Sequence, residues 1–146
     1  MRVFLDTNIL LDVLLVRPPF VAESEAVILR CETKGWPMFI AWHGLATAYY
    51  LLKRGRTETA TLAKVDKLLA WASVAAVSDP HARTARRLGF TDFEDALQAV
   101  SAQACGAAVI VTRNPLDFIT SPVPAQTPHE FLQTVPPSSS TEKPSP

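Results

Sequence analysis

Short apolar runs alternate with longer stretches of helical spacing along almost the whole chain, and this alternation limits the folds that it can adopt. Apolar runs at residues 2–5, 37–41 and 107–112 have the length of strands and are bounded by turn or helix-start residues. The last run, AAVIVT, is apolar almost throughout, which is typical of a strand covered on both faces of a parallel sheet. Strands that alternate with helices favour an α/β fold. We therefore expect a three-layer α/β/α sandwich around a small, mostly parallel central sheet.

The segments between these runs carry the spacing and end signals of helices. We expect helices over residues 7–16, 20–35, 42–55, 57–72, 79–90, 91–106 and 127–135, and weaker strands at 73–77 and 123–127. Asp79 is expected to cap one helix, and Thr91 to form a capping box with Glu94 in the next. The predicted inner faces of three helices comprise Leu45, Ala48, Tyr49 and Leu52; Leu62, Val65, Leu68 and Leu69; and Phe93, Leu97, Val100 and Ala104.

Length and composition are typical of one globular domain: the chain has 146 residues, of which 48% are apolar and 19% charged. Its 14 basic and 14 acidic residues neither support nor exclude a nucleic-acid ligand, because a net sum hides local patches. Residues 136–146 are rich in proline and serine and cannot bury enough apolar surface to become ordered. We therefore expect a domain over residues 1–135, followed by a disordered tail.

Cellular location and redox state follow from absent signals. Cys31 and Cys105 show neither metal-ligand spacing nor a disulfide framework, and we expect both to be reduced and buried. Asp6 and Asp12 interrupt the first apolar run, and no cleavage site of a signal peptide follows it. No uncharged apolar stretch reaches the ~20 residues that a membrane span needs. A cytoplasmic protein without membrane association is the default expectation.

Acidic and amide side chains recur where the expected fold would bring them together. Asp6 ends the first strand, and Asn114 and Asp117 follow the AAVIVT strand in the segment TRNPLDF. The carboxyl ends of parallel strands meet at one edge of a sheet. Asp92 and Asp95 are three residues apart, so they share one face of a helix. The sequence therefore predicts a cluster of polar side chains at this edge.

Each of these residues also has an ordinary structural interpretation: a helix cap for Asp6, first-turn acids for Asp92 and Glu94, a turn start for Asn114 and a surface acid for Asp117. These interpretations do not explain the set, because acids within ~4 Å repel by several kcal/mol at an effective dielectric constant near 20. Carboxylates with an amide oxygen suit Mg²⁺ or Mn²⁺ rather than zinc. Such an ion can activate a water molecule and stabilise charge on a phosphate.

Two segments, VFLDTNILLD at 3–12 and GFTDFEDALQAVSAQACGAAVIVTRNPLDF at 89–118, resemble the PIN-domain ribonucleases, as does the order of strands and helices between them. The resemblance covers roughly residues 2–133. It is closer to a bacterial branch with DFEDAL and TRNPLDF motifs than to standard VapC-type toxins. It implies an Mg²⁺- or Mn²⁺-dependent endoribonuclease that hydrolyses phosphodiester bonds of single-stranded RNA. Some family members are toxins held by an antitoxin and many pair through helices, so an antitoxin and a second copy are candidate partners.

Roles for individual residues are carried over from the matching motifs. The resemblance implies that Asp6, Asp95 and Asp117 are metal ligands and that Asp92 and Asn114 complete the catalytic set. The residues expected to contact substrate are Asn8, Thr112 and Arg113. Asn8 is also expected to orient Asp6 or its loop.

The chain departs from the family in the helix that follows the second strand. The family carries a glutamate there, whereas residues 42–55 contain no acid, Thr47 stands at the expected position, and His43 lies one turn earlier. Losing one carboxylate should weaken metal binding, so a PIN domain that binds RNA or a protein without cleaving is the alternative hypothesis. Two other classes fit poorly. A haloacid-dehalogenase phosphatase needs an acid where Asn8 stands, and a dinucleotide-binding domain needs a G-x-G-x-x-G motif after a strand.

Basic and aromatic residues offer further RNA contacts. The basic candidates are Lys53, Arg54, Arg56, Arg83, Arg86 and Arg87, and the aromatic candidates are Trp36, Trp42, Tyr49 and Tyr50. The basic residues suit a rim around an acidic pocket, where they would hold RNA phosphates, but they also suit solvated helix ends. The aromatic residues could stack bases or pack in the core or in a dimer.

Overall fold

The computed structural model describes residues 1–134, and the tail predicted for 136–146 lies outside the described residues. A five-stranded sheet runs in the order β3-β2-β1-β4-β5, and every neighbouring pair in it is parallel. The strands are β1 (Val3–Leu5), β2 (Met38–Ile40), β3 (Ser73–Val74), β4 (Val109–Val111) and β5 (Ala125–Gln126). The predicted small parallel sheet is thus confirmed, and β5 is an edge strand as expected.

Helices connect the strands in the predicted order. They are α1 (Thr7–Leu14), α2 (Val21–Lys34), α3 (Trp42–Lys53), α4 (Glu58–Trp71), α5 (Asp79–Arg87), α6 (Phe93–Ala104) and α7 (Pro128–Thr134). A short 3₁₀ helix, η1 (Pro115–Phe118), follows β4 and was not predicted. The helices are generally shorter than the segments predicted for them, because their terminal residues form caps and turns.

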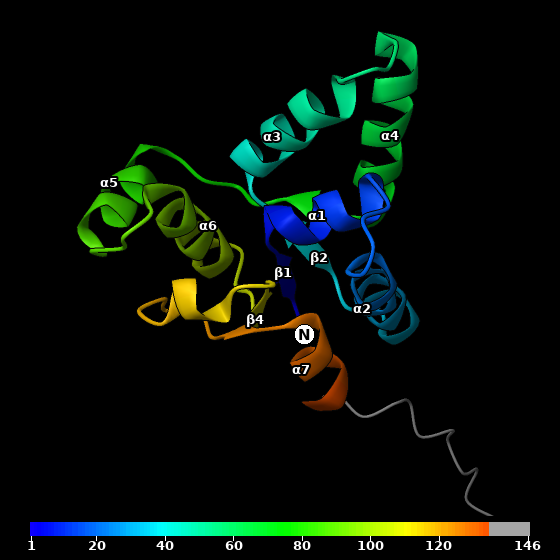
Figure 1. The fold of residues 1–146 in the computed structure, drawn as a ribbon. Helices are drawn as coiled ribbons and strands as arrows, with labels where there is room; N and C mark the ends of the chain where they lie inside the picture. Colours follow the sequence, from blue (N-terminus) through cyan, green and yellow to red (C-terminus); the bar gives the residue numbers. More distant parts are fainter. Residues whose placement is uncertain (135–146) are drawn as a thin grey trace, which may run out of the picture.

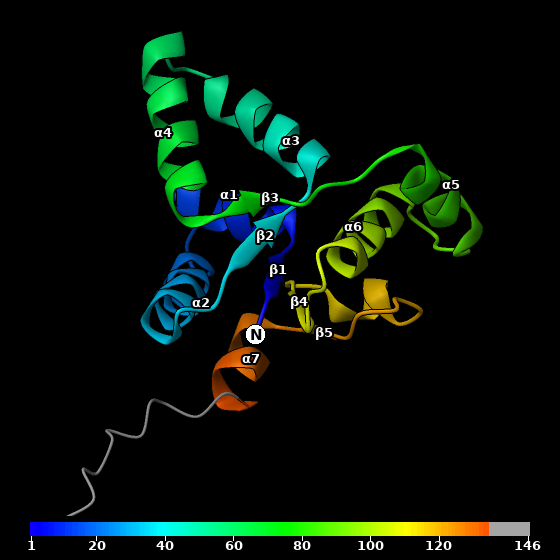
Figure 2. The same cartoon turned by 180° about the vertical axis from the view of Figure 1, so that it is seen from behind.

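The sheet separates two apolar layers, as a three-layer sandwich requires. Val3 and Leu5 of β1 pack in a core with residues of α1, α2, α3, α4 and α7. Phe4, which points to the opposite face, packs with Ala99 and Ala102 of α6. Helix α5 lies against the outer side of α6 (Figures 1 and 2). The alternation of side chains along β1 therefore gives each layer its own core.

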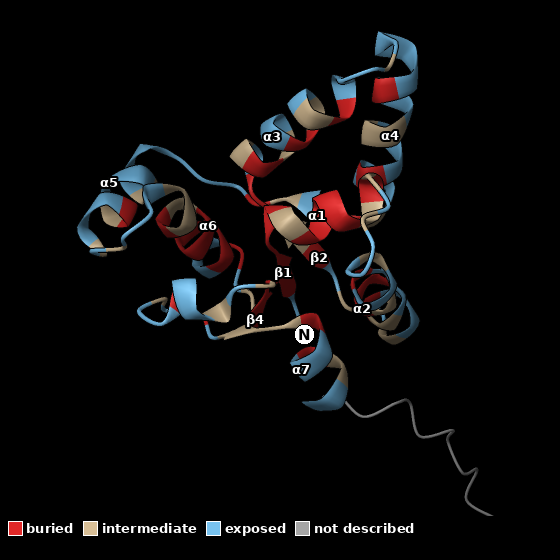
Figure 3. Ribbon diagram, in the orientation of Figure 1, coloured by how far each residue is buried: buried red, intermediate tan, exposed pale blue. Residues whose placement is uncertain are grey.

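The pair α3–α4 and the pair α5–α6 extend to opposite sides of the carboxyl end of β1 (Figure 1). Both pairs expose much of their outer surface, while β1, α1 and the inner side of α6 are buried (Figure 3). The carboxyl ends of β1 and β4 therefore lie near the first turns of α3 and α6 (Figure 1).

Several predicted core positions are wrong. Leu62 and Leu69 of α4 are each 45% exposed and Phe93 of α6 is 48% exposed. Helix α4 packs mainly against α3, so only a narrow strip of it, with Thr61 and Leu68, is fully covered.

Two predicted caps also differ from the structure. Ser78 rather than Asp79 is the N-cap of α5, and Asp92 rather than Thr91 is the N-cap of α6, where it accepts a hydrogen bond from the Glu94 amide.

Two further expectations concern cysteines and membranes. Cys31 and Cys105 are buried free thiols, as predicted, and burial raises the pKa of Cys31 to about 12. Within residues 1–134, none of the helices combines the length and the apolar character needed to cross a membrane. The cytoplasmic location stays a prediction.

Candidate active site

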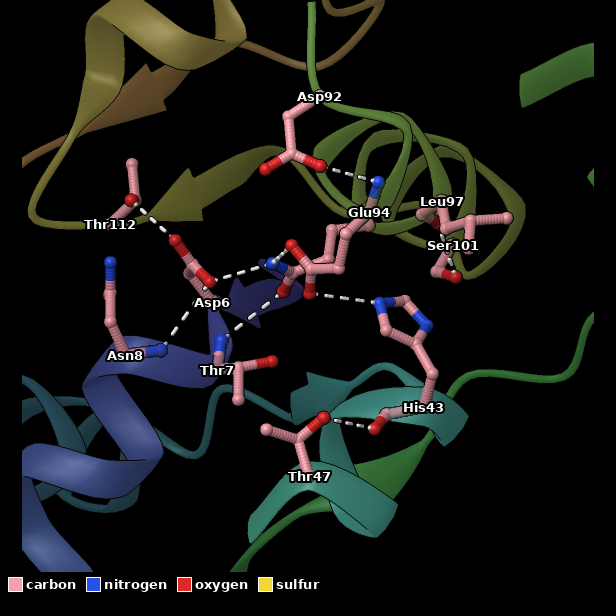
Figure 4. Close-up of polar contacts among 11 residues, drawn as sticks. Asp6, Thr7, Asn8, His43, Thr47, Asp92, Glu94, Leu97, Ser101 and Thr112 are labelled. Carbon is pink, nitrogen blue, oxygen red and sulfur yellow. Dashed lines mark hydrogen bonds and ion pairs between the residues drawn. The ribbon is translucent and has the colours of Figure 1, made fainter. Parts of the chain in front are cut away.

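Asp6 lies at the end of β1 and forms the N-cap of α1, so it occupies both of the positions considered for it in the sequence. Its carboxylate is buried and held on both oxygens. Thr112 donates a 2.6 Å hydrogen bond to Oδ2 (Figure 4), and the Gln98 amide donates a 2.7 Å hydrogen bond to Oδ1. The Asn8 backbone amide adds a longer contact of 3.4 Å to Oδ1. The Asp6 side chain therefore has a fixed orientation.

The environment of Asp6 acts on its charge in opposing ways. Burial raises the pKa of Asp6, because a carboxylate loses its hydration there. The hydrogen bonds from Thr112 and Gln98 stabilise the charged form and oppose this effect, while the charge of Glu94 adds to the increase. Asp6 is thus a carboxylate whose ionised form would gain from a nearby cation.

Three acids at the start of α6 form the densest group of carboxylates in the described part of the chain. Asp92, Glu94 and Asp95 each place one carboxylate oxygen within 4.8 Å of the others. Burial, the proximity of Glu94 and the charges of Asp92 and Asp6 together raise the pKa of Asp95 to about 7. Asp95 therefore holds a proton far more readily than an isolated aspartate does.

Glu94 connects this group to the two neighbouring elements. Its Oε1 lies 3.1 Å from Nε2 of His43 on α3, and its Oε2 accepts a 3.3 Å hydrogen bond from the Gln98 amide. In Figure 4, His43 reaches Glu94 from α3 while Asp92 and Asp6 approach from the other side. The hydrogen bond to His43 lowers the pKa of Glu94. His43 thus bridges the first turns of α3 and α6.

Asp117, after β4, lies across a cavity from the α6 acids, whereas Asn114 and Asp6 are not among the residues that line this cavity. The cavity, of about 420 Å³, is lined by Asp92 and Asp95 on one side and by Leu116 and Asp117 of η1 on the other. Asp117 is exposed. The Asn114 backbone amide donates a 3.1 Å hydrogen bond to Thr112 Oγ1, the same hydroxyl that binds Asp6. The structure therefore connects the TRN segment to Asp6 through Thr112.

Arg113 is occupied away from the acidic cluster. Its Nε lies 3.0 Å from Oδ2 of the fully buried Asp12, and its guanidinium lies 4.1 Å from the centre of the Phe20 ring. The Arg113 backbone amide contacts Asn8 Oδ1 at 3.5 Å. A second cavity, of about 280 Å³, lies beside Phe20 and Arg113. Arg113 and Asn8 therefore have structural contacts within the protein, and their contact with substrate stays a proposal.

Thr47, at the position of the missing glutamate, is exposed and donates its hydroxyl to the His43 carbonyl at 3.1 Å. Of the aromatic candidates, Trp42 and Tyr50 are 68% and 69% exposed, whereas Trp36 packs edge-on against Phe131. The side chains available for base stacking are therefore on the first and third turns of α3.

Sequence reasoning singled out neither Gln98 nor the contact of His43 with Glu94. One signal could have identified Gln98: it is a large polar residue on the inner side of α6, whose other buried residues are small and mostly apolar, and it lies four residues after Glu94. The contact of His43 with Glu94 joins residues 51 positions apart and had no local signal.

The donor set fits a hard divalent cation. Mg²⁺ and Mn²⁺ prefer carboxylate oxygens, and the three α6 acids present such oxygens within the span of one coordination shell. The closeness of these acids crowds negative charge, which raises the pKa of Asp95 and which a cation would neutralise. The residues present therefore suit Mg²⁺ or Mn²⁺, and Asp6 lies near enough for its charge to contribute.

Comparison with known families identifies the fold. Residues 2–115 match the family model of the PIN domain. The chain belongs to the PIN domain family. No curated protein sequence is significantly similar to this PIN domain.

Solved structures with the same fold include two VapBC structures and a toxin–antitoxin complex. VapBC2 of Rickettsia felis, bound to a DNA fragment from its promoter, is 20% identical with a TM-score of 0.66, covering 87% of this chain and 98% of that chain. VapBC-1 of nontypeable Haemophilus influenzae is 17% identical with a TM-score of 0.66, and the match covers 88% of this chain and 99% of that chain. A toxin–antitoxin complex from Klebsiella pneumoniae is 22% identical with a TM-score of 0.65, and the match covers 88% of this chain and 98% of that chain. At these identities the similarity establishes the PIN fold alone.

Proposed function

We propose that this PIN domain is a metal-dependent endoribonuclease that hydrolyses phosphodiester bonds of single-stranded RNA. The observation that carries the proposal is the crowding of Asp92, Glu94 and Asp95 beside the buried Asp6, at the carboxyl edge of a parallel sheet. Crowded carboxylates are unfavourable unless a cation neutralises them. Membership of a family that consists largely of nucleases supports the same reaction class.

In this proposal Asp6, Asp95 and Asp117 hold Mg²⁺ or Mn²⁺, with Asp92 and Asn114 at the edge of the same site. The bound cation would supply an activated water and stabilise negative charge on the phosphate. Thr112 and Gln98 fix the direction of the Asp6 oxygens. Asp92, Asp95 and Asp117 line the cavity between α6 and η1, where a flexible single strand would reach these acids. The active unit would be the domain over residues 1–135.

RNA binding needs positive charge around this acidic site, because phosphates and carboxylates repel each other. We propose that the exposed Arg86 and Arg87 of α5 contact the RNA backbone, together with Asn8 and Arg113 near β4, whereas Thr112, which was expected to contact substrate, is fully buried against Asp6. Trp42, exposed at the start of α3 beside His43, would stack on a base. These contacts would position a strand without specifying its sequence.

The test is a cleavage assay with a labelled single-stranded RNA over a range of Mg²⁺ and Mn²⁺ concentrations. Wild type is expected to cleave with either ion and to stop when the ion is chelated, and Asp6→Asn is expected to be inactive. Asp66→Asn, a matched change on the exposed face of α4, should leave cleavage intact. Equal cleavage by wild type and Asp6→Asn would identify a contaminating nuclease and overturn the proposal.

One observation favours a second candidate, a PIN domain that binds RNA or protein without cleavage. Helix α3 contributes no carboxylate, and its nearest polar residue, His43, is engaged with Glu94. This candidate predicts that wild type retards the same RNA in a gel without Mg²⁺ or Mn²⁺ and never cleaves it.

We further propose an antitoxin protein as a partner of this chain. The similar structures from Rickettsia felis and Haemophilus influenzae are VapBC complexes. The α3–α4 pair exposes the apolar side chains Trp42, Tyr50, Leu62 and Leu69, which a partner or a second copy could cover. Co-expression with the protein encoded next to this gene should give a stable complex by size-exclusion chromatography. A chain that stays monomeric in this experiment would argue against both partners.

A further inference from the structure

Gln98 occupies a place in the site that an apolar residue would normally fill. It lies on the inner side of α6 among Ala99 and Ala102, and only 1% of its surface is exposed. Burying a primary amide is unfavourable unless its donors and acceptor find partners. All of its polar atoms do so, and two of the three partners are carboxylates.

The orientation of this amide is determined by its neighbours. Gln98 Oε1 accepts a 3.2 Å hydrogen bond from the Thr7 backbone N–H, which can only donate. Gln98 Nε2 faces Asp6 Oδ1 at 2.7 Å and Glu94 Oε2 at 3.3 Å, which can only accept when ionised. A reversed amide would lose all three hydrogen bonds, so the two N–H groups must face the two carboxylates.

The neutral side chain of Gln98 therefore joins Asp6, which follows β1, to Glu94 on α6. Without a donor between them, Asp6 and Glu94 would repel each other and turn apart. With Gln98 between them, Asp6 is held on both oxygens by Gln98 and Thr112, and Glu94 is held on both by Gln98 and His43. A lysine or arginine would also join two acids, but it would neutralise the charge that a cation needs.

We propose that Gln98 is a positioning residue that holds Asp6, a proposed metal ligand, and the neighbouring Glu94 side by side and still charged at the metal site. The effect on metal affinity rests on the proposed function, whereas the hydrogen-bonded arrangement itself does not. Groups that orient metal ligands typically change metal affinity by about 10–100-fold when they are lost. Gln98 touches neither the reacting atoms nor the cation in this proposal, and it acts through Asp6 and Glu94.

The first experiment compares Gln98→Met with Gln103→Met, the same change at an exposed position of α6. Methionine keeps the length of the side chain and removes its N–H donors. Mn²⁺ binding to the RNA-free protein, followed by the electron paramagnetic resonance of free Mn²⁺, should weaken by at least about tenfold in Gln98→Met and stay unchanged in Gln103→Met. Affinity within about twofold of wild type, in a folded Gln98→Met protein, would overturn the proposal.

A second measurement needs neither bound metal nor a stable Gln98 variant. In a metal-free wild-type ¹⁵N–¹H spectrum, the two side-chain N–H protons of Gln98 should be shifted downfield and exchange slowly, unlike those of Gln103. Asp6→Asn and Glu94→Gln should each move the Gln98 resonances, because each removes one acceptor. Fast exchange and unchanged resonances in both variants would overturn the arrangement. If wild type binds no Mn²⁺ at all, the proposed function fails, and these resonances alone decide whether Gln98 orients the two acids.

Discussion

The Asp12 carboxylate on α1 is fully buried, and its Oδ2 lies 3.0 Å from the Arg113 guanidinium after β4. Burial raises the pKa of Asp12, and the charge of Arg113 opposes that increase. Removing one partner of a buried ion pair leaves an uncompensated charge. Arg113→Met should therefore lower the free energy of unfolding by about 3 kcal/mol, measured by urea denaturation.

The matched control is Arg83→Met, which breaks an exposed pair with Asp79 on α5 and should cost less than about 1 kcal/mol. The double variant Asp12→Asn/Arg113→Met should recover much of the loss, because no buried charge remains. Equal stability of Arg113→Met and Arg83→Met would contradict a structural role for Arg113 and leave substrate contact as its main role.

Asp6→Asn should abolish the stabilisation that Mn²⁺ gives to the folded protein. A ligand that binds only the native state raises the melting temperature, and Asn at position 6 keeps the shape of the side chain while removing its charge. Thermal unfolding with and without Mn²⁺ checks this. Wild type and Asp66→Asn should both melt at a higher temperature with Mn²⁺, and an equal increase for Asp6→Asn would show that the ion binds elsewhere.

The metal-free protein should lose stability as the pH rises from about 4 to about 7. The pKa of Asp95 is raised to about 7 in the folded state, so in this range the folded chain holds a proton that the unfolded chain has released. The free energy of unfolding therefore falls with increasing pH, and Asp6, whose pKa is also raised, acts in the same direction.

Urea denaturation in the presence of a chelator, at a series of pH values, measures this slope. Asp95→Asn should make the slope shallower, whereas Asp66→Asn should not change it. A wild-type protein that becomes more stable between pH 4 and pH 7 would contradict the raised pKa of Asp95. Such a result would mean that groups whose pKa values are lowered by folding dominate the change in protonation.

Gly44→Ala should destabilise the protein, although alanine normally favours a helix interior by about 1 kcal/mol over glycine. A Cβ at position 44 would lie 2.7 Å from the Thr7 hydroxyl oxygen, where α3 crosses α1. Thr7→Ala removes that oxygen, which makes no hydrogen bond within residues 1–134. The double variant should therefore regain the stability that Gly44→Ala loses, as measured by thermal unfolding. A Gly44→Ala protein more stable than wild type would show that the two helices move apart easily.

Thr47→Glu should strengthen Mn²⁺ binding, because it adds a carboxylate on α3, one turn after His43 and on the side that faces Thr7 (Figure 4). Additional negative ligands raise the affinity of a site for hard cations. Isothermal titration with Mn²⁺ measures the effect, and Thr59→Glu on the exposed face of α4 is the control. Weaker binding in Thr47→Glu than in Thr59→Glu would mean that the new carboxylate competes with Glu94 for His43.

Sequence patterns were sufficient for the fold. The buried run in β4 and the caps at Asp6 and Thr127 are local signals, and the structure has the strands and helices that they predict. Leu62 and Phe93 were placed wrongly in the core, because helical spacing identifies an apolar face without showing whether another element covers it. The α3–α4 pair extends from the sheet, which no periodicity within α4 could show.

The candidate site was only partly predictable. Asp6, Asp92 and Asp95 are marked by strand ends and helix spacing, and the structure brings them near one another. The roles of Gln98 and His43 depend on contacts across 92 and 51 residues, which a single sequence does not reveal.

The order of the strands also determines when the site can exist during synthesis. Strand β1 is made first but lies in the middle of the sheet, and Asp6 obtains its hydrogen bonds from residues 92 and 106 positions further along the chain. A nascent chain in which Thr112 has not yet emerged from the ribosome therefore cannot form the Thr112 hydrogen bond to Asp6, even if its first helices have already folded. A chain whose synthesis stops before β4 would therefore lack both the Thr112 contact and a fully oriented Asp6 carboxylate.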